Sequence, residues 1–441
     1  MSSSLLRRGI KSVKQLIAPD SNAELKPRER ARLREQLTEC AQGIGGEVST
    51  RQRANRLSET YLKLSDRGRH DLLRLIALEF GPQPAAVELA HAAYQASIGS
   101  PAQWDAEAAL RAALRSSRIR ILTQLNAQPQ GVKFLVDLRA DLLRYLEDDP
   151  ELAALDRELE ARLTAWFDVG FLELQRITWG SPAVLLEKLI QYEAVHEIRS
   201  WTDLKNRLDS DRRCYAFFHP RMPLEPLIFV EVALTEQLAD NVQLLLDEHA
   251  PVFDAERANT AIFYSISNTQ AGLRGVSFGN FLLKRVVDDL KRDFPRLTTF
   301  ATLSPLPQLA RWAMGHPEEL TACGIDLSFA QLACGDFSSE RKLRRQQGEG
   351  LARLGARYLS MAKDAGDRPY DPVARFHLGN GARIERINAF ADSSTRGLRQ
   401  SFGLMVNYRY DLQDIENNVE AYVGGGIIAS SATLRRQARV P

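Results

Sequence analysis

A glycine-rich stretch, QAGLRGVSFGN at residues 270–280, has the clearest chemical potential in this sequence. It follows AIFYSIS (261–267), whose β-branched and aromatic residues predict a strand. It leads into NFLLKRVVDDLKRDF (280–294), whose apolar residues recur at helical spacing. A loop of this kind exposes backbone N–H groups at the start of a helix, where the helix dipole adds a partial positive charge. The stretch therefore predicts a site that holds a phosphate or a pyrophosphate.

The spacing of the glycines separates this loop from two common phosphate-binding motifs. It lacks the pattern GxxxxGK[ST], which excludes a P-loop nucleoside triphosphatase. It also lacks GxGxxG, and no acidic residue ends the following strand, which disfavours a dinucleotide-binding fold. The run from Arg274 to Gly279 instead resembles the pyrophosphate loop of GNAT-type acyltransferases, which bind coenzyme A. On the loop alone, a purely structural glycine turn remains an alternative.

Ser304 and His377 are side chains of types that serve in proton transfer and carboxylate binding. Ser304 follows the predicted strand 298–303 and precedes Pro305, and His377 precedes a Gly-Asn-Gly turn at 379–381. Position alone favours plainer interpretations, a turn-forming serine and a histidine at a helix C-terminus. The four cysteines form no CxxC pair and have no histidine at metal-ligand spacing, so the sequence predicts no structural metal site.

Residues 166–441 mix strand and helix patterns, and these elements must position the loop and the two side chains. The predicted strands are, in chain order, 171–179, 212–219, 226–234, 261–267, 298–303 and 403–412. The second and third of them form a predicted hairpin. Ser181 is the predicted N-cap of a helix with Pro182 at its first position. Residues 371–392 are predicted to begin as a helix, to break at the Gly-Asn-Gly turn and then to continue as a helix.

Residues 23 to about 165 show apolar residues at helical spacing in six segments, separated by breakers such as GIGG at 43–46 and GPQP at 81–84. This pattern predicts an antiparallel helical bundle. It has no cluster of catalytic side chains, so we expect it to support assembly or to cover another domain. The predicted class is therefore α+β, with an N-terminal all-α bundle (1–165) followed by a mixed α/β domain (166–441).

Composition limits the classes of partner. With 44% apolar and 26% charged residues and a net charge of +2, the chain of 441 residues suits a soluble globular protein with no nucleic-acid partner and no membrane partner. The first 18 residues are basic and lack acids, which fits either a transit peptide or an amphipathic starter segment, and we favour the second. The last residues, ARVP, carry no peroxisomal signal, so we expect a cytoplasmic protein.

Several segments together resemble the malonyl-CoA decarboxylase family. They include AIFYSISNTQAGLRGVSFGNFLLKRVV, FPRLTTFATLSPLPQLARW, RRCYAFFHPRMPLEPLIFVEVALT, GEVSTRQRANRL and the distinctive pairing of FHLGNGA with NYRY. The resemblance covers both halves of the chain. It implies a helical N-terminal domain, a catalytic domain of GNAT-like fold and the conversion of malonyl-CoA to acetyl-CoA and carbon dioxide. It also implies a homo-oligomer, a dimer or a tetramer.

The resemblance assigns roles to individual residues. The pyrophosphate of coenzyme A is expected to lie against Arg274, Gly275, Val276, Ser277, Phe278, Gly279 and Asn280. Ser304 is expected to contact the malonyl group, with His377 as its catalytic partner. Ser277 departs from relatives that carry a carboxylate there, which puts any role for an acid at that position in doubt.

The expected chemistry needs no metal and no organic cofactor, because the thioester carbonyl accepts the electrons released with carbon dioxide. The resulting enolate needs donors for its oxygen and a proton for its carbon, and a histidine that titrates near neutral pH can supply that proton.

Two functions from other classes remain open at this point. An acyl-CoA-dependent N-acyltransferase of the GNAT type shares the loop and the fold, but it needs an amine and releases free coenzyme A. A non-catalytic protein would bind coenzyme A without turnover and use its helical half as a partner surface. The fate of the thioester separates these alternatives, because a decarboxylase leaves it intact.

Overall fold

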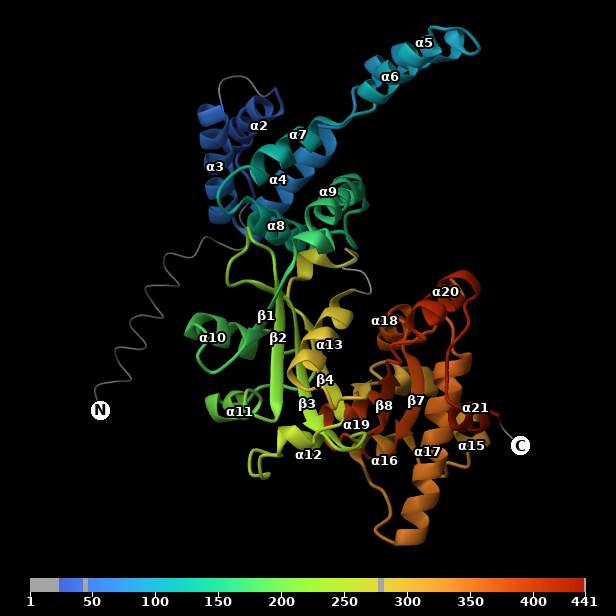
Figure 1. Ribbon diagram of the computed structural model, residues 1–441. Helices are drawn as coiled ribbons and strands as arrows, with labels where there is room; N and C mark the ends of the chain where they lie inside the picture. Colours follow the sequence, from blue (N-terminus) through green and yellow to red (C-terminus); the bar gives the residue numbers. More distant parts are fainter. Residues whose placement is uncertain (1–23, 43–46, 277–280, 440–441) are drawn as a thin grey trace. The chain divides into compact units, whose positions relative to one another are not determined.

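The computed structural model describes residues 24–42, 47–276 and 281–439 and divides into two compact units (Figure 1). The first unit, here called the helical unit, comprises residues 1–168, 220–223 and 270–277. The second, here called the sheet unit, comprises residues 169–219, 224–269 and 278–441. The helical unit therefore includes two short segments that lie far along the chain. The domain boundary placed after residue 165 remains a prediction from sequence.

The helical unit is built from helices that bury leucines against one another. In chain order they are α2 (Pro27–Gln42), α3 (Glu47–Lys63), α4 (Asp66–Glu79), α5 (Pro84–Ser97), α6 (Gln103–Ala113), α7 (Ser117–Asn126), α8 (Gly131–Tyr145) and α9 (Ala153–Trp166). Leu37, Leu73 and Leu135 are fully buried. Helices α5 and α6 differ, because they have no buried residue and form a hairpin that extends from the rest of the unit (Figure 1).

The strands of the described sheet unit form one eight-stranded sheet in the order β1-β2-β3-β4-β5-β8-β6, with β7 paired to β8. The strands are β1 (Glu173–Ile177), β2 (Arg212–Phe218), β3 (Pro226–Thr235), β4 (Thr260–Asn268), β5 (Thr299–Thr302), β6 (Ser304–Pro305), β7 (Arg383–Asn388) and β8 (Met405–Arg409). Neighbours pair antiparallel except β4 and β5, which are parallel. The predicted α+β class is confirmed, an α-helical N-terminal part followed by a mixed α/β part.

Helices complete the sheet unit. They are α10 (Ala183–Tyr192), α11 (Trp201–Asn206), α12 (Val242–Leu245), α13 (Phe281–Asp293), α14 (Leu309–Gly315), α15 (Pro317–Ala322), α16 (Phe329–Cys334), α17 (Arg341–Met361), α18 (Pro372–Gly379), α19 (Thr395–Ser401), α20 (Ile415–Gly425) and α21 (Ala432–Ala438). Leu185 and Leu189 of α10 belong to one core cluster with Cys214 of β2. Among the residues that the structure describes, every helix is too short or too polar to span a bilayer.

The parallel strands β4 and β5 separate part-way along their length. Their pairing runs from Thr260–Thr299 to Phe263–Thr302 and stops there. Beyond that point β4 stays paired to β3 as far as Asn268, whereas the chain after Thr302 pairs with β8 as the two-residue strand β6. A register shift in the β3–β4 pair falls beside the same point. The sheet therefore opens where Ser304 begins β6.

Two predictions about local structure were wrong. After the turn at 379–381 the chain forms strand β7 instead of a second helix, because Gly381 adopts a φ of +80° and Ile384 and Ile387 bury their side chains at the edge of β8. Ser181 is not the N-cap of α10, whose cap position is Pro182. The Ser181 hydroxyl oxygen instead accepts a hydrogen bond from the Thr178 N–H in the preceding turn.

The described part of the glycine-rich loop folds with the helical unit. A short helical turn, η4 (Ala271–Leu273), packs against α8. The side chain of Arg139 is buried and donates hydrogen bonds to the carbonyl oxygens of Gly272 and Arg274, at 3.0 and 2.7 Å. Gly275 has a φ of +88°, which favours glycine. Ser277, Phe278, Gly279 and Asn280 lie outside the described residues.

Gly272 is expected to tolerate no side chain. A Cβ atom there would lie 1.8 Å from the carbonyl oxygen of Val136 in α8, so the two backbones must separate to admit it. We expect Gly272→Ala to lower the free energy of unfolding by about 3 kcal/mol, measured by urea denaturation. Gly81→Ala is the control, because its Cβ would meet only ordinary contacts, 3.7 Å or more from Arg118. Equal stability of the two variants would contradict this packing role.

Candidate active site

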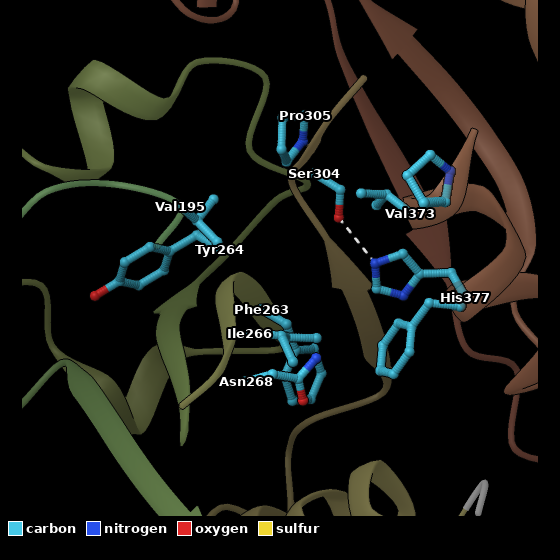
Figure 2. Close-up of a pocket in the computed structure, with 11 residues that line it drawn as sticks. Val195, Phe263, Tyr264, Ile266, Asn268, Ser304, Pro305, Val373 and His377 are labelled. Carbon is cyan, nitrogen blue, oxygen red and sulfur yellow. Dashed lines mark hydrogen bonds between the residues drawn. The ribbon is translucent and has the colours of Figure 1, made fainter. Parts of the chain in front are cut away.

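A pocket of about 210 Å³ opens where β4 and the chain after β5 separate (Figure 2). One wall comes from β4, and the opposite wall comes from β6 and α18. The lining residues are Val195, Phe263, Tyr264, Ile266, Asn268, Ser304, Pro305, Pro372, Val373, Phe376 and His377. All of them belong to the sheet unit. The structure thus brings Ser304 and His377, 73 residues apart in the sequence, into one cavity.

The start of helix α18 fixes the direction in which His377 points. Asp371 caps the helix, and its Oδ1 accepts hydrogen bonds from the backbone N–H groups of Val373 and Ala374. Its Oδ2 accepts a hydrogen bond from the Tyr358 hydroxyl at 2.9 Å. Pro372 occupies the first turn, where a missing N–H costs nothing. The buried carboxylate of Asp371 thus caps the short helix that carries the imidazole.

The imidazole of His377 makes a contact at each nitrogen and on one face. Nε2 lies 3.1 Å from Ser304 Oγ, and Nδ1 lies 2.8 Å from the Tyr410 hydroxyl oxygen. The ring stacks on Tyr408, with centroids 4.5 Å apart and planes 25° apart. His377 is 2% exposed and Ser304 is 6% exposed. The pair is therefore held on every side except that of the pocket.

Burial decides the charge of His377. It lowers the pKa of the imidazole from its ordinary value of 6.5 to about 3, because the charged form would lose its hydration. The imidazole is therefore neutral at pH 7. The expectation of a histidine that titrates near neutral pH is wrong for the protein alone, because the sequence does not reveal how deeply the ring is buried.

The wall of the pocket is mostly apolar. Among the described residues that line it there is no lysine and no arginine. Its polar groups are Ser304, His377, Asn268 and Tyr264, and Figure 2 shows the Tyr264 hydroxyl directed away from the serine–histidine pair. A carboxylate in this pocket would meet few polar groups and no lysine or arginine side chain. Such surroundings favour a reaction that removes the charge from the carboxylate.

Comparison with known proteins identifies the family. Residues 170–440 match the family described as malonyl-CoA decarboxylase C-terminal domain, and residues 80–167 match its N-terminal domain. The mitochondrial malonyl-CoA decarboxylase of Rattus norvegicus is 39% identical over 357 residues, which are 75% of this chain and 72% of the relative. The chain belongs to the malonyl-CoA decarboxylase family.

Solved structures of family members share the fold over nearly the whole chain. A malonyl-CoA decarboxylase from Rhodopseudomonas palustris is 41% identical, with a TM-score of 0.83 over 93% of this chain and 99% of that one. One from Agrobacterium vitis is also 41% identical, with a TM-score of 0.84 over 92% of this chain and 100% of that one. The resemblance stated from sequence is confirmed.

The predicted site residues fall into three groups according to where the structure places them. It places Ser304 and His377 in hydrogen-bond contact. It describes Arg274, Gly275 and Val276 as part of the helical unit. The other loop residues lie outside the described part. Among the described residues, no group of three or more His, Cys, Asp or Glu side chains could hold a metal ion. The roles assigned to the loop, and the expectation that no cofactor is needed, remain predictions.

Two residues of the site were missed from sequence. Tyr410 contacts His377 Nδ1, and Thr302 accepts a hydrogen bond from the Ser304 hydroxyl at 2.9 Å. A signal for Tyr410 was present, because it ends the NYRY motif that accompanies FHLGNGA in this decarboxylase family. Thr302 gave no signal, since threonine is an ordinary residue in a strand.

Burial of a neutral His377 is expected to make stability depend on pH. The unfolded histidine titrates near 6.5 and the folded one at about 3, so the unfolded chain binds more protons between these values. This contribution to stability is present above pH 6.5 and is lost as the pH falls toward 3. We expect His377→Gln to reduce the slope of unfolding free energy against pH by up to about 1.4 kcal/mol per unit.

Urea denaturation at several pH values between 6.5 and 4 measures this slope. His196, whose pKa burial lowers to about 4, contributes equally to the parent protein and to the variant, so the difference isolates His377. The control is His249→Gln at an exposed position. An unchanged slope in His377→Gln would show that the imidazole is not buried in its neutral form.

Proposed function

We propose that this chain decarboxylates malonyl-CoA to acetyl-CoA and carbon dioxide, with Ser304 and His377 as its catalytic residues. The observation that carries the proposal is the buried hydrogen-bonded pair at the wall of an apolar pocket, in a chain of the malonyl-CoA decarboxylase family. The malonyl group enters the pocket, and its carboxylate lies beside Ser304. The phosphates of coenzyme A lie against residues 274–280.

Bond cleavage follows from the surroundings of the carboxylate. The bond between the carboxyl carbon and the methylene carbon breaks, its electron pair moves toward the thioester carbonyl, and neutral carbon dioxide leaves. The negative charge moves from the carboxylate to the enolate oxygen. The described wall has no lysine or arginine and replaces little of the hydration of a localised carboxylate, whereas a delocalised enolate suffers less from the loss of water. The pocket therefore favours the product side of this step.

Protonation of the enolate carbon is the task of His377. A negative substrate in the pocket raises the pKa of the imidazole above its value in the protein alone, because a nearby anion favours the charged ring. The imidazolium then gives up one proton, which reaches the carbon either directly or through the Ser304 hydroxyl. Acetyl-CoA forms and the imidazole returns to its neutral state. The balance needs one proton from solvent and no oxidant, metal or organic cofactor.

Two further parts of the proposal concern the whole protein. We propose a homo-oligomer, a dimer or a tetramer, since Leu89 and Trp104 of the α5–α6 hairpin are 75% and 74% exposed and apolar groups of this size are usually covered. Light scattering after size exclusion measures the assembly.

We also propose a cytoplasmic location, which cell fractionation tests against the mitochondrial location in the names of the rat, mouse and goose relatives.

Product analysis tests the reaction itself. Purified protein incubated with malonyl-CoA is expected to yield acetyl-CoA and carbon dioxide in equal amounts, without release of free thiol. Free coenzyme A formed only when an amine is added would favour an N-acyltransferase. Binding of malonyl-CoA without any product would favour a non-catalytic protein. Either of these results would refute the proposed reaction.

Removal of His377 tests the assignment of roles. We expect His377→Ala to lower kcat by about 10²- to 10⁴-fold, the usual contribution of a general acid, while binding of coenzyme A changes little. Steady-state kinetics and calorimetric titration with coenzyme A measure the two properties. The matched control is His249→Ala, at an exposed position outside the pocket. Undiminished turnover in His377→Ala would remove this residue from the mechanism.

A further inference from the structure

We propose that Thr302 sets the tautomer of His377, so that the serine–histidine pair is arranged to donate a proton and not to activate a nucleophile. The inference rests on the proposed decarboxylase function and names a positioning residue for it. Thr302 does not line the pocket, and it acts through Ser304.

The single hydroxyl proton of Ser304 is the starting point. The geometry makes Ser304 Oγ the donor to Thr302 Oγ1, at 2.9 Å. A serine hydroxyl has one proton, so the same group cannot also donate to His377. The 3.1 Å contact between Ser304 Oγ and Nε2 must therefore be a hydrogen bond that Nε2–H donates. In a neutral imidazole Nδ1 is then an acceptor, and the Tyr410 hydroxyl donates to it at 2.8 Å.

Thr302 is held as an acceptor by the strand beside it. The backbone N–H of Tyr408 in β8 donates a hydrogen bond to Thr302 Oγ1 at 3.1 Å. The side-chain oxygen of Thr302 thus takes the place of the backbone carbonyl oxygen that would accept this bond in a regular strand pair. The Thr302 carbonyl oxygen accepts instead from Asn407 Nδ2 at 2.7 Å. Asn407 and Thr302 are both fully buried. This exchange of partners occurs between β5 and β6, where the pairing with β8 is interrupted, and it leaves the buried hydroxyl oxygen of Thr302 little freedom to turn.

This arrangement is the reverse of a nucleophilic serine–histidine pair. In such a pair the histidine nitrogen accepts the serine proton and raises the nucleophilicity of its oxygen. Here Thr302 takes that hydrogen bond, and Nε2 keeps its own proton toward Ser304. The charged ring can therefore supply a proton when the enolate forms. The Ser304 hydroxyl turns from Thr302 toward the enolate, its O–H bond breaks as a C–H bond forms on the enolate carbon, and the Nε2 proton restores the Ser304 hydroxyl. The ring is left neutral with the solvent-derived proton on Nδ1, and exchange with solvent returns a proton to Nε2. No acyl-enzyme is formed.

The tautomer can be read directly by NMR. In full-length protein labelled with ¹⁵N in the histidine rings, the parent chain is expected to show a protonated Nε2 and an unprotonated Nδ1 for His377 at pH 7. The signal is assigned by its loss in His377→Gln, among seven histidines in the chain. A parent protein with the proton on Nδ1 would overturn the proposal, and this measurement needs no variant of Thr302 and no turnover.

Two substitutions then test the cause. Thr302→Val removes the acceptor at nearly constant volume, so Ser304 is free to donate to Nε2. We expect the tautomer to reverse and kcat to fall roughly 100-fold with KM nearly unchanged. Ser304 should also become reactive toward a fluorophosphonate probe. Thr302→Ser restores an acceptor oxygen and is expected to recover the parental tautomer and most of the lost turnover.

The outcomes separate this inference from its alternatives. A Thr302→Val protein that keeps the parental tautomer and turnover overturns it. If that variant fails to fold because the Tyr408 N–H loses its partner, the tautomer of the parent protein and of Thr302→Ser still decides the matter. A chain that turns over no malonyl-CoA refutes the proposed function, but the position of the ring proton stays measurable. The two failures are therefore distinguishable.

Discussion

The separation of two parallel strands after Phe263 and Thr302 is the constraint on which the site depends. A strand that leaves a sheet exposes backbone donors and acceptors, and buried ones need partners. On the other side of β5 the pairing with β8 is also interrupted before β6, and side chains supply the partners there, since Asn407 donates to the Thr302 carbonyl oxygen and the Tyr408 N–H donates to the Thr302 hydroxyl oxygen. The residues that close this gap are neighbours of the residues that line the pocket. The same few residues therefore complete the hydrogen bonding of the sheet and hold the pocket residues in place.

Burial of the His377 imidazole determines the charge of the ring. The imidazole of His377 lies among two tyrosine rings and a serine, and its hydrogen-bond partners in the described part of the chain carry no charge. Its charge is therefore set by what enters the pocket. An anionic substrate brings the one favourable partner for a charged ring, and loss of carbon dioxide delocalises that negative charge. The same low polarity that makes the free imidazole a weak base couples its protonation to the occupancy of the pocket.

Much of the fold could be predicted from the sequence, because the strand 261–267, the hairpin of 212–219 and 226–234 and the helices of the first half have strong local patterns. The strand at 383–388 could not, since its pairing with β8 outweighs its local preference. Ser304 and His377 were found through family resemblance. Thr302 was not, because threonine is an ordinary residue in a strand, and Tyr410 was not, although it ends the NYRY motif, because its partner His377 lies 33 residues earlier. A hydrogen bond across such a separation leaves no periodicity in the sequence.

The segment 270–276 has a consequence for how this protein can change. It lies between a strand and a helix of the sheet unit, yet it folds with the helical unit, where Gly272 rests on α8 and Arg139 binds two of its carbonyl oxygens. The helical unit therefore cannot be separated from the sheet unit by a single cut in the sequence. A helical unit exchanged with that of a relative must match the glycine-rich segment inserted from elsewhere in the chain. Evolution can vary the two units only if this short piece of sequence varies with both.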